Sequence, residues 1–439
     1  MSLTQLAADC AAKGRPVRVG LIGAGKFGSM FLSQVPTITG LKVTCIADLD
    51  VGRARSACSA IGWDADRVGA TKYTEDGAAL AARDDVDVVI EATGNPRVGI
   101  AHALAAIEAG KHVVMVNVEA DVLAGPALAR RARSAGVVYS MAYGDQPALI
   151  AEMVDWARST GFNVAAAGKG TKYMPAYHAV TPNDVWQHYG LTPEQASKAG
   201  MNPQMFNSFL DGTKSAIEMA AIANATGLGV PEDGLAFLPC GVDDLAHVLR
   251  PREVGGQLGT TCGGTGMVEV VSSLERDGRP VFRDLRWGVF VVLEAPNDYA
   301  AACFAQYGLP TDVTGRYAAM YKPFHLIGLE LSISVLSAAL RGEATGALEA
   351  FRAGAVAVAK RDLRSGDMLD GEGGYTVWGR LAPASASTDA FLPLPIGLAH
   401  KVQVVRDVPA GQALTFADVR IEEDSIVAIH REALRIDGS

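Results

Sequence analysis

Residues 17–28 read Val-Arg-Val-Gly-Leu-Ile-Gly-Ala-Gly-Lys-Phe-Gly, a short apolar stretch that runs directly into Gly23, Gly25 and Gly28. A strand followed by glycines at this spacing is typical of a dinucleotide-binding turn. The first glycine permits a tight turn, the second lets the backbone approach a pyrophosphate, and the third lets the next helix pack close to the strand. The sequence therefore predicts a nucleotide-binding Rossmann unit, with these three glycines at the cofactor.

The residues after the glycines continue the same pattern. A helix expected over 26–34 places Lys26 and Phe27 in its first turn, where free N–H groups and the helix dipole favour phosphate. A second strand, expected over 41–47, ends in Asp48. An acidic residue about 20 positions beyond the glycines typically accepts hydrogen bonds from the adenosine ribose hydroxyls. We therefore expect Lys26, Phe27 and Asp48 at the cofactor as well.

Composition places the chain among well-buried globular proteins. Of its 439 residues, 49% are hydrophobic and 20% are charged, which fits two or three domains. The formal net charge of −9 argues against nucleic acid or an anionic membrane as the main partner. The cysteines show no Cys-x-x-Cys spacing, and the N-terminal stretch does not resemble a signal peptide. We therefore expect a cytoplasmic protein without a disulfide framework or a zinc site.

Three segments of different character follow one another along the chain. Residues 1–160 alternate strand and helix and predict a doubly wound parallel sheet, so the fold class is α/β. Residues 161–348 are mixed and predict a central α+β domain for catalysis and association. Residues 349–439 are rich in glycine and proline and predict a small β-rich domain. Within it, residues 360–367 are echoed by residues 405–412, which indicates a weak internal repeat.

Polar residues follow the later strands of the first segment. The strand expected over 87–92 runs into Thr93 and Gly94, and the strand expected over 112–116 runs into Asn117. Ligands bind at the carboxyl ends of the strands in open parallel sheets, so we expect these three residues at the cofactor. Three carboxylates at strand ends offer contacts to ribose or to a metal ion, although no metal-ligand set is identified: Glu91, Glu119 and Asp145.

The central segment offers a lysine beside carboxylates. A long helix expected over 207–225 carries Asp211, Lys214 and Glu218, and the last two are four residues apart on one face. A lysine near a carboxylate polarises a carbonyl or moves a proton as a hydride arrives. We therefore expect Lys214 and Asp211 to be catalytic, with Asn207 on the same face toward substrate. The alternative is a solvated ion pair between Lys214 and Glu218.

The stretch 168–173 is a candidate anion-binding loop. It reads Gly-Lys-Gly-Thr-Lys-Tyr and follows a short strand expected over 163–167. A loop with glycines and two cations would cradle an anion, so we expect Lys169 and Lys172 at the substrate. The alternative is a solvated loop.

A third cluster of cations lies before a helix expected over 323–340. Arg316, Lys322 and His325 lie close to its expected start, where an anion is favoured by the helix N-terminus. The pattern predicts substrate contacts for these residues, with a structural histidine as the alternative. The same helix is expected to return and pack on the Rossmann unit.

These motifs resemble a known family. The Gly23-x-Gly25-x-x-Gly28 turn, the glycine stretch at 168–173 and the Leu210–Lys214 stretch Leu-Asp-Gly-Thr-Lys resemble homoserine dehydrogenases. The C-terminal segment resembles the small SAF-like β-domain of antifreeze-like and flagellar accessory proteins. Together, across essentially the whole chain, they are similar to the Brucella-type branch of 1-deoxy-D-xylulose 5-phosphate reductoisomerase-like oxidoreductases. The 321–326 stretch, Tyr-Lys-Pro-Phe-His-Leu, carries much of that resemblance.

The resemblance implies an activity and a set of roles. It implies NADPH-dependent conversion of 1-deoxy-D-xylulose 5-phosphate, a phosphorylated sugar, to 2-C-methyl-D-erythritol 4-phosphate, with Mg²⁺ or Mn²⁺ assisting the rearrangement. Dehydrogenases of this build often pair through sheet faces, so we expect a homodimer. The implied catalytic residues are Lys214, Asp211, Lys172 and His325, and the implied substrate contacts are Lys169, Asn207, Arg316 and Lys322.

Departures from the family leave alternatives open. Homoserine dehydrogenases have Asn-Lys at the strand end where this chain has Asn117 and Val118. The first alternative is an ordinary dehydrogenase acting on an amino-acid semialdehyde or on another sugar acid or phosphate, and the second is a nucleotide-sensing regulatory protein. Asp48 repels a 2′-phosphate, whereas Arg53 and Arg55 offset that repulsion. We expect NADPH, held in part by Arg53, with NADH as the alternative.

Overall fold

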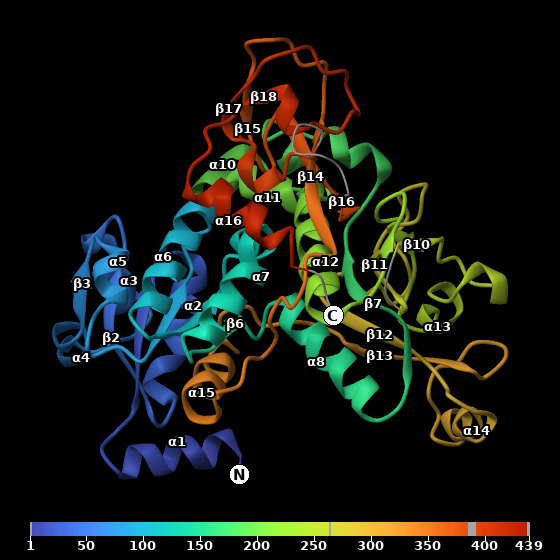
Figure 1. Ribbon diagram of the computed structural model, residues 1–439. Coiled ribbons are helices and arrows are strands. Elements are labelled where there is room, and N and C mark those ends of the chain that lie inside the picture. Colours follow the sequence, from blue (N-terminus) through green and yellow to red (C-terminus); the bar gives the residue numbers. More distant parts are fainter. Residues whose placement is uncertain (1, 263–264, 385–391, 437–439) are drawn as a thin grey trace. The chain divides into compact units, whose positions relative to one another are not determined.

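The computed structural model describes residues 2–262, 265–384 and 392–436 (Figure 1). The described chain forms two compact units, which are not sequential segments. Unit 1 takes its residues from the chain up to Glu152, from His325–Ala350 and from Ala428–Ile436, and unit 2 from Met153–Phe324 and Phe351–Val427. The three-domain division expected from composition stays a prediction.

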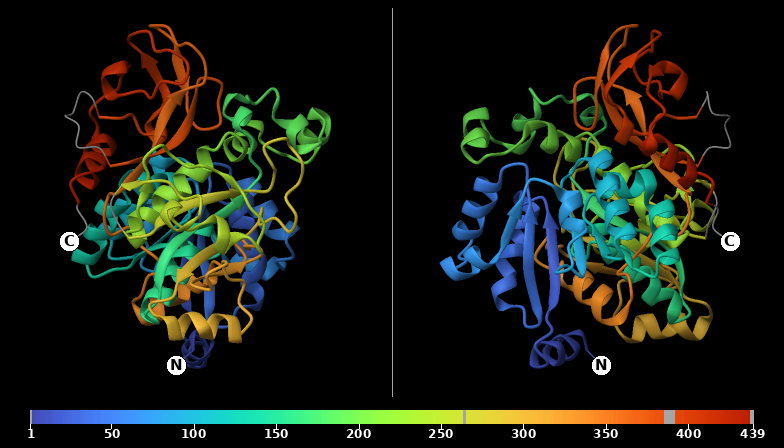
Figure 2. Two further views of the ribbon diagram at one scale, coloured as in Figure 1. Left: turned by 90° about the vertical axis from the view of Figure 1, so that its right-hand side faces the viewer. Right: turned by 60° about the vertical axis from the view of Figure 1, so that its left-hand side comes forward.

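Unit 1 is built on a six-stranded sheet with the order β3-β2-β1-β4-β5-β6. Every neighbouring pair of strands is parallel. The strands are almost continuously apolar because helices cover both faces of the sheet (Figure 2). This arrangement confirms the expected α/β Rossmann fold. The strands are β1 (Val17–Ile22), β2 (Leu41–Ala47), β3 (Lys72–Thr74), β4 (Val88–Glu91), β5 (His112–Met115) and β6 (Tyr139–Met141).

The helices of unit 1 follow its strands. Several begin at a side-chain cap that accepts a hydrogen bond from the first turn, as Asp50 does for α3 and Asn95 for α6. They are α1 (Leu3–Ala12), α2 (Lys26–Gln34), α3 (Val51–Ala60), α4 (Ala65–Ala70), α5 (Gly77–Ala81), α6 (Pro96–Glu108), α7 (Val118–Ser134), α15 (Ser332–Arg341) and parts of α8 (Gln146–Ser159) and α16 (Ser425–Ala433).

The α15 helix returns to the Rossmann sheet, as expected. Leu331, Val335 and Leu336 belong to one buried cluster with Val19 of β1 and Ile90 of β4. The expected start of this helix is wrong, however, because it begins at Ser332 and not near residue 323. The residues before it form turns, so the 321–326 stretch does not precede a helix N-terminus directly.

Unit 2 contains a mixed five-stranded sheet with the order β13-β12-β7-β11-β9. Its strands are β7 (Asn163–Thr171), β9 (Leu238–Pro239), β11 (Met267–Ser272), β12 (Val289–Glu294) and β13 (Tyr317–Lys322), and β8 (Val230–Pro231) pairs separately with β10 (Thr261–Cys262). Its helices are α9 (Val185–Tyr189), α10 (Pro193–Lys198), α11 (Pro203–Leu210), α12 (Thr213–Thr226), α13 (Leu245–Val248) and α14 (Asp298–Gln306). Among the residues that the structure describes, no helix combines the length and apolar composition of a membrane span.

The glycines expected in an anion-binding loop lie inside β7 instead. Gly168 pairs with Glu269 of β11 and Phe290 of β12, so Gly168–Thr171 continues the strand. A Cβ on Gly168 would lie 1.7 Å from the Glu269 carbonyl oxygen, and one on Gly170 would lie 1.9 Å from the Leu285 carbonyl oxygen. The loop prediction is therefore wrong, because these glycines permit close approach of neighbouring backbone.

The long helix expected over 207–225 is two helices. The α11 helix ends at Leu210, and α12 begins at Thr213 after Gly212, whose φ of +93° lies in the left-handed region. Glycine adopts this conformation without the steric cost that a side chain brings. The expectation that Asn207 and Lys214 share one helical face is therefore wrong, because the helix is broken between them.

The C-terminal strands lie in unit 2, where β14 and β16 contact α12 (Figure 1). They are β14 (Ala353–Ala359), which pairs with β16 (Val377–Pro383), and β15 (Met368–Asp370), β17 (His400–Val404) and β18 (Val419–Arg420), which form a three-stranded sheet. The two halves of the weak repeat pair with each other, since Leu363 and Val408 exchange backbone hydrogen bonds of 2.8 and 2.9 Å. The β-rich character of this segment is confirmed.

A buried carboxyl group, Asp121 of α7, lies inside unit 1. Its side chain accepts a hydrogen bond of 2.9 Å from the Tyr139 hydroxyl. Burial raises the pKa of Asp121 to about 7, although the hydrogen bond from Tyr139 opposes the shift. A carboxyl group in this position is most stable in its protonated form.

We expect Asp121→Asn to be more stable than the natural protein at pH 8. The stability gained from the raised pKa is present below the unfolded pKa of about 4 and is lost as pH rises through the folded value. An amide avoids the cost of ionisation and still accepts the hydrogen bond of Tyr139. Denaturant unfolding should show a gain of up to about 4 kcal/mol at pH 8 that shrinks toward pH 4. The exposed control Asp66→Asn should show no such trend, and equal pH profiles for both variants would contradict the assignment.

Candidate active site

The glycine turn of unit 1 has the geometry of a phosphate cradle. Gly23 has a φ of +96°, and a Cβ there would lie 2.6 Å from the Ala92 carbonyl oxygen. A Cβ on Gly28 would lie 2.4 Å from the Gly23 carbonyl oxygen, so α2 packs directly on the turn. A Cβ on Gly25, in contrast, would have no atom within 4 Å. Gly25 therefore leaves open space at the N-terminus of α2, where a pyrophosphate is favoured.

Asp48 is fixed at the end of β2 beside this turn. Its carboxylate accepts hydrogen bonds from the Ala24 N–H at 2.9 Å, the Asp50 N–H at 3.0 Å and the Arg53 guanidinium at 2.8 Å. Burial alone would raise the pKa of Asp48, but these hydrogen bonds and the charge of Arg53 lower it below its usual value. Asp48 thus stays ionised, and Arg53 is already paired with it.

The other expected cofactor residues lie at the same carboxyl edge of the sheet. The Thr93 hydroxyl donates to the buried Glu91 carboxylate at 2.6 Å, and Gly94 adopts a φ of +72°. The Asn117 Oδ1 accepts from the Ala120 N–H at 3.1 Å and caps α7. These contacts fix the strand ends, so the cofactor roles of these residues stay predictions. Lys26 is exposed in the first turn of α2, whereas Phe27 is half-buried against the core.

In unit 2, Asp211 does not pair with Lys214. Its carboxylate is fully buried and lies 2.8 Å from the ammonium of Lys360, a residue that the sequence analysis did not select. Asp211 also accepts from the Thr213 N–H at 2.9 Å, across the turn at Gly212. The expected partnership of Asp211 and Lys214 is therefore not seen in this structure.

The other carboxylate expected near Lys214 is also engaged elsewhere. Glu218 forms a buried ion pair with Lys169, so the alternative of a solvated Lys214–Glu218 pair is wrong. The Lys169 side chain is about 5% exposed, and breaking a buried pair is strongly unfavourable. This placement gives no support to a substrate role for Lys169.

Lys214 and Lys172 are the two other candidate lysines of unit 2. The ammonium of Lys214 lies 3.9 Å from the carboxylate of Glu372, a residue of the C-terminal segment. Lys172 is half-buried and donates to the His188 carbonyl oxygen. Burial, and then the charge of Arg286, lower the pKa of Lys172. Such a lysine exchanges a proton nearer to neutral pH than an exposed one.

The remaining predicted substrate residues have different local surroundings. Asn207 is fully buried and donates to the Val180 and Gly373 carbonyl oxygens, both at 2.9 Å. Arg316 forms an exposed ion pair with Asp298 at 2.9 Å. Lys322 ends β13 in unit 2, whereas His325 belongs to unit 1, seven residues before α15 begins. The substrate and catalytic roles expected for these residues therefore stay predictions.

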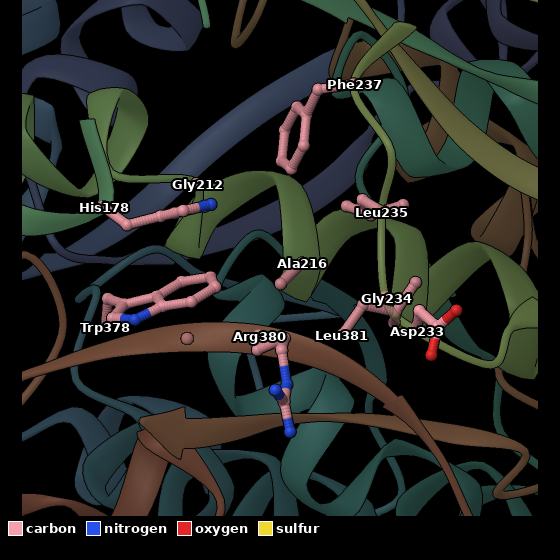
Figure 3. Close-up of a pocket in the computed structure, with 11 residues that line it drawn as sticks. His178, Gly212, Ala216, Asp233, Gly234, Leu235, Phe237, Trp378, Arg380 and Leu381 are labelled. Carbon is pink, nitrogen blue, oxygen red and sulfur yellow. The ribbon is translucent and has the colours of Figure 1, made fainter. Parts of the chain in front are cut away.

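A cavity of about 90 Å³ lies beside the start of α12 (Figure 3). The His178 and Trp378 rings stack in its wall with centroids 3.8 Å apart. Both His178 nitrogens are engaged, with the Asp211 carbonyl oxygen at 2.7 Å and the Tyr173 hydroxyl at 3.0 Å, and burial lowers the pKa of His178.

A buried carboxylate supports one wall of this cavity. Glu269 accepts hydrogen bonds from the N–H groups of Ala236, Phe237 and Val270. Burial nevertheless raises the pKa of Glu269 to about 7. Phe237 has a φ of +50° and stacks on Tyr173 at 3.9 Å, so its strained backbone is held from two sides.

The described residues contain no group of three His, Cys, Asp or Glu side chains that could hold a metal ion. Asp48 accepts hydrogen bonds from the chain itself, and Asp211 is paired with Lys360. We therefore derive no step through Mg²⁺ or Mn²⁺.

Two family models match adjoining parts of the chain. Residues 17–143 match an oxidoreductase family with an NAD-binding Rossmann fold. Residues 144–331 match the catalytic domain of oxidoreductase DRL. The first match agrees with the Rossmann fold of unit 1.

Short segments of the chain are similar to curated enzymes. The chain is 34% identical over 98 residues to inositol 2-dehydrogenase 3 of Saccharopolyspora erythraea, covering 22% of this chain and 26% of that protein. It is 30% identical over 112 residues to homoserine dehydrogenase of Neisseria gonorrhoeae, covering 24% and 23%. The chain thus spans about a quarter of the length of these curated relatives.

Solved dehydrogenase structures are similar only distantly. A probable dehydrogenase from Thermotoga maritima is matched over 75% of this chain and 90% of its own, with 16% identity and a TM-score of 0.39. A myo-inositol dehydrogenase from Lactobacillus casei, in complex with NAD(H) and myo-inositol, is matched over 39% and 50%, with 18% identity and a TM-score of 0.29. Likeness at this level does not bear on the residues of the site.

We expect Gly25→Ala to lose nucleotide affinity without losing stability. The new methyl group meets no atom of the protein but occupies the space into which the pyrophosphate would approach. Titration with NADH or NADPH, followed by fluorescence, should show binding weakened by about tenfold or more. The matched control Gly69→Ala, on an exposed helix position of the same unit, should bind normally. Equal affinity of the two variants would exclude the cradle as the phosphate site.

Proposed function

We propose that this chain is an NAD(P)-dependent oxidoreductase that interconverts an alcohol and a carbonyl group on a small polar molecule. The observation that carries the proposal is the turn at Gly25, which is open to a pyrophosphate and lies beside an ionised Asp48. The family models that match residues 17–143 and 144–331 support the same class.

The bound nicotinamide supplies the hydride acceptor or donor, and the chain supplies the groups that bind and protonate. The N–H groups at the start of α2 would hold the phosphates, and Asp48 would accept from ribose hydroxyls. The ammonium of Lys214 would donate a proton to the substrate oxygen as the carbonyl is reduced and recover it in the reverse direction. Lys172, whose pKa is lowered by burial, is the second candidate for this role.

The substrate class follows from the same groups. Cations such as Lys214, Lys172 and Lys322 in unit 2 favour a hydroxylated or anionic substrate over an apolar one. Polyols, as in the inositol dehydrogenases, and amino-acid semialdehydes, as in the homoserine type, are the first to test. We also keep the homodimer and the small-molecule partner as part of this proposal.

The sugar-phosphate reductoisomerase is our second candidate. The absence of a lysine at the Asn117–Val118 strand end favours it, because it argues against simple semialdehyde chemistry. The comparisons support the broader oxidoreductase class better than this particular reaction. The reductoisomerase needs a rearrangement step beyond hydride transfer, for which we assign no residue.

We expect purified protein to oxidise NADH or NADPH with one member of a substrate panel, and Lys214→Gln to lower kcat by about a hundredfold or more. The panel contains inosose and other keto-polyols, aspartate semialdehyde, and 1-deoxy-D-xylulose 5-phosphate with Mg²⁺ or Mn²⁺. The measurement is the absorbance of the reduced nicotinamide. Lys198→Gln, an exposed lysine of the same unit, is the matched control.

The outcomes of this panel separate the candidates. Turnover of the deoxyxylulose phosphate that chelation abolishes would establish the reductoisomerase, whereas turnover of a polyol or semialdehyde without added metal would establish a simple dehydrogenase. Tight nucleotide binding with no turnover of any panel member would instead favour a nucleotide-sensing regulatory protein.

We expect the natural protein to prefer NADH, which reverses the NADPH preference expected from the resemblance. Asp48 is held ionised by Ala24 and Asp50, and Arg53 is already paired with it, so a 2′-phosphate would meet a negative charge. The variant Asp48→Asn should shift the ratio of the two dissociation constants toward NADPH by about tenfold. Asp50→Asn removes a charge two residues away, keeps a good helix cap and should leave the ratio unchanged. An unchanged ratio of the two dissociation constants in Asp48→Asn would disprove the role of Asp48 in cofactor preference.

A further inference from the structure

The C-terminal segment presents a well-fixed loop to α11. In this loop, residues 370–376, the backbone carbonyl oxygens of Asp370 and Glu372 both accept from the Gln204 side chain at 2.9 Å. The Gly373 carbonyl oxygen accepts from Asn207 at 2.9 Å. The Gly374 carbonyl oxygen accepts a hydrogen bond of 2.8 Å from Lys360. Four hydrogen bonds from side chains to backbone carbonyl oxygens therefore anchor the loop.

Glycines bring this loop onto the helix backbone. Gly373 has a φ of +64°, and a Cβ there would lie 2.1 Å from the Gln204 carbonyl oxygen and 2.8 Å from the Ser208 nitrogen. Within the loop, the Asp370 carboxylate accepts from the N–H groups of Tyr375 and Thr376. The backbone of the loop is therefore fixed from both sides, and so is the position from which Glu372 projects.

Glu372 projects toward the candidate catalytic lysine. Its carboxylate lies 3.9 Å from the Lys214 ammonium, and the two side chains are only 25% and 19% exposed. The two carboxylates that sequence spacing places near Lys214 are engaged elsewhere, Asp211 with Lys360 and Glu218 with Lys169. An ion pair that is mostly shielded from solvent is screened less by salt than a surface pair.

We propose that Glu372 is a positioning residue for Lys214, so that the C-terminal β segment completes the catalytic site and is not only an accessory domain. The carboxylate restricts the flexible lysine side chain to one orientation, which favours proton transfer to a bound substrate. This inference rests on the proposed function for its kinetic consequence. The orientation of Lys214 itself is testable without any substrate.

The first test follows Lys214 directly. Reductive methylation with ¹³C-formaldehyde places an NMR label on each lysine, and Lys214→Arg identifies the resonance of Lys214. We expect Glu372→Gln to shift and narrow this resonance, because the side chain loses its charged partner and gains mobility, and Glu372→Asp to have a smaller effect. Glu422→Gln, an exposed carboxylate of the same segment, is the control. An unchanged Lys214 resonance in Glu372→Gln would overturn the proposal whether or not a substrate is known.

The second test uses the substrate identified by the panel above. We expect Glu372→Gln to lower kcat by about tenfold with KM changed by less than threefold, and Glu372→Asp to recover part of the loss. A rise in KM alone would overturn the positioning role, since it would show that Glu372 contacts the substrate. If no panel member is turned over, the proposed function fails while the NMR result still decides the placement of Lys214.

Discussion

A buried ion pair between Asp211 and Lys360 is the interaction on which the arrangement of unit 2 depends. The two side chains are 0% and 2% exposed, and their charged atoms are 2.8 Å apart. Charges at this depth are stable only together, and removing one partner of such a pair typically costs about 3–5 kcal/mol. Asp211 follows α11 and Lys360 follows β14, so the pair fixes the C-terminal strands to the helices that carry Lys214.

The parts of the fold that the sequence predicted correctly are those whose cause is local. The glycines of the 23–28 turn lie beside the strand and helix that they serve, so their spacing alone indicates their role. Gly168 and Gly170 look similar in the sequence, but they face the backbone of Glu269 and Leu285, about a hundred residues away in the chain. No pattern within the 168–173 stretch distinguishes a loop for an anion from a strand with close neighbours.

The candidate site was predicted less well for the same reason. Asp211 and Lys214 were selected for their chemistry, yet their partners, Lys360 and Glu372, lie in a segment that the sequence treated as a separate domain. The sequence does contain a weak signal for this segment, the repeat of residues 360–367 at 405–412. In the structure the repeat is a symmetric pair in which Asp362 accepts from the Ala410 N–H and Asp407 accepts from the Ser365 N–H, both at 2.9 Å. The repeat therefore explains how the two halves of the C-terminal segment pair. It does not indicate that Lys360, two residues before the first aspartate, pairs with Asp211.

The residues that follow β5, Asn117 and Val118, include no side chain that could donate a proton to a substrate. Homoserine dehydrogenases have a lysine after the asparagine, whereas this chain has Val118, which is buried as the first residue of α7. Asn117 is itself committed to capping that helix. A valine cannot move a proton, so reduction of a carbonyl group requires a titratable side chain from another element. In the proposed function, Lys214 would meet that requirement, because its ammonium is mostly shielded from solvent and lies 3.9 Å from the Glu372 carboxylate, and the loop that carries Glu372 is held by hydrogen bonds.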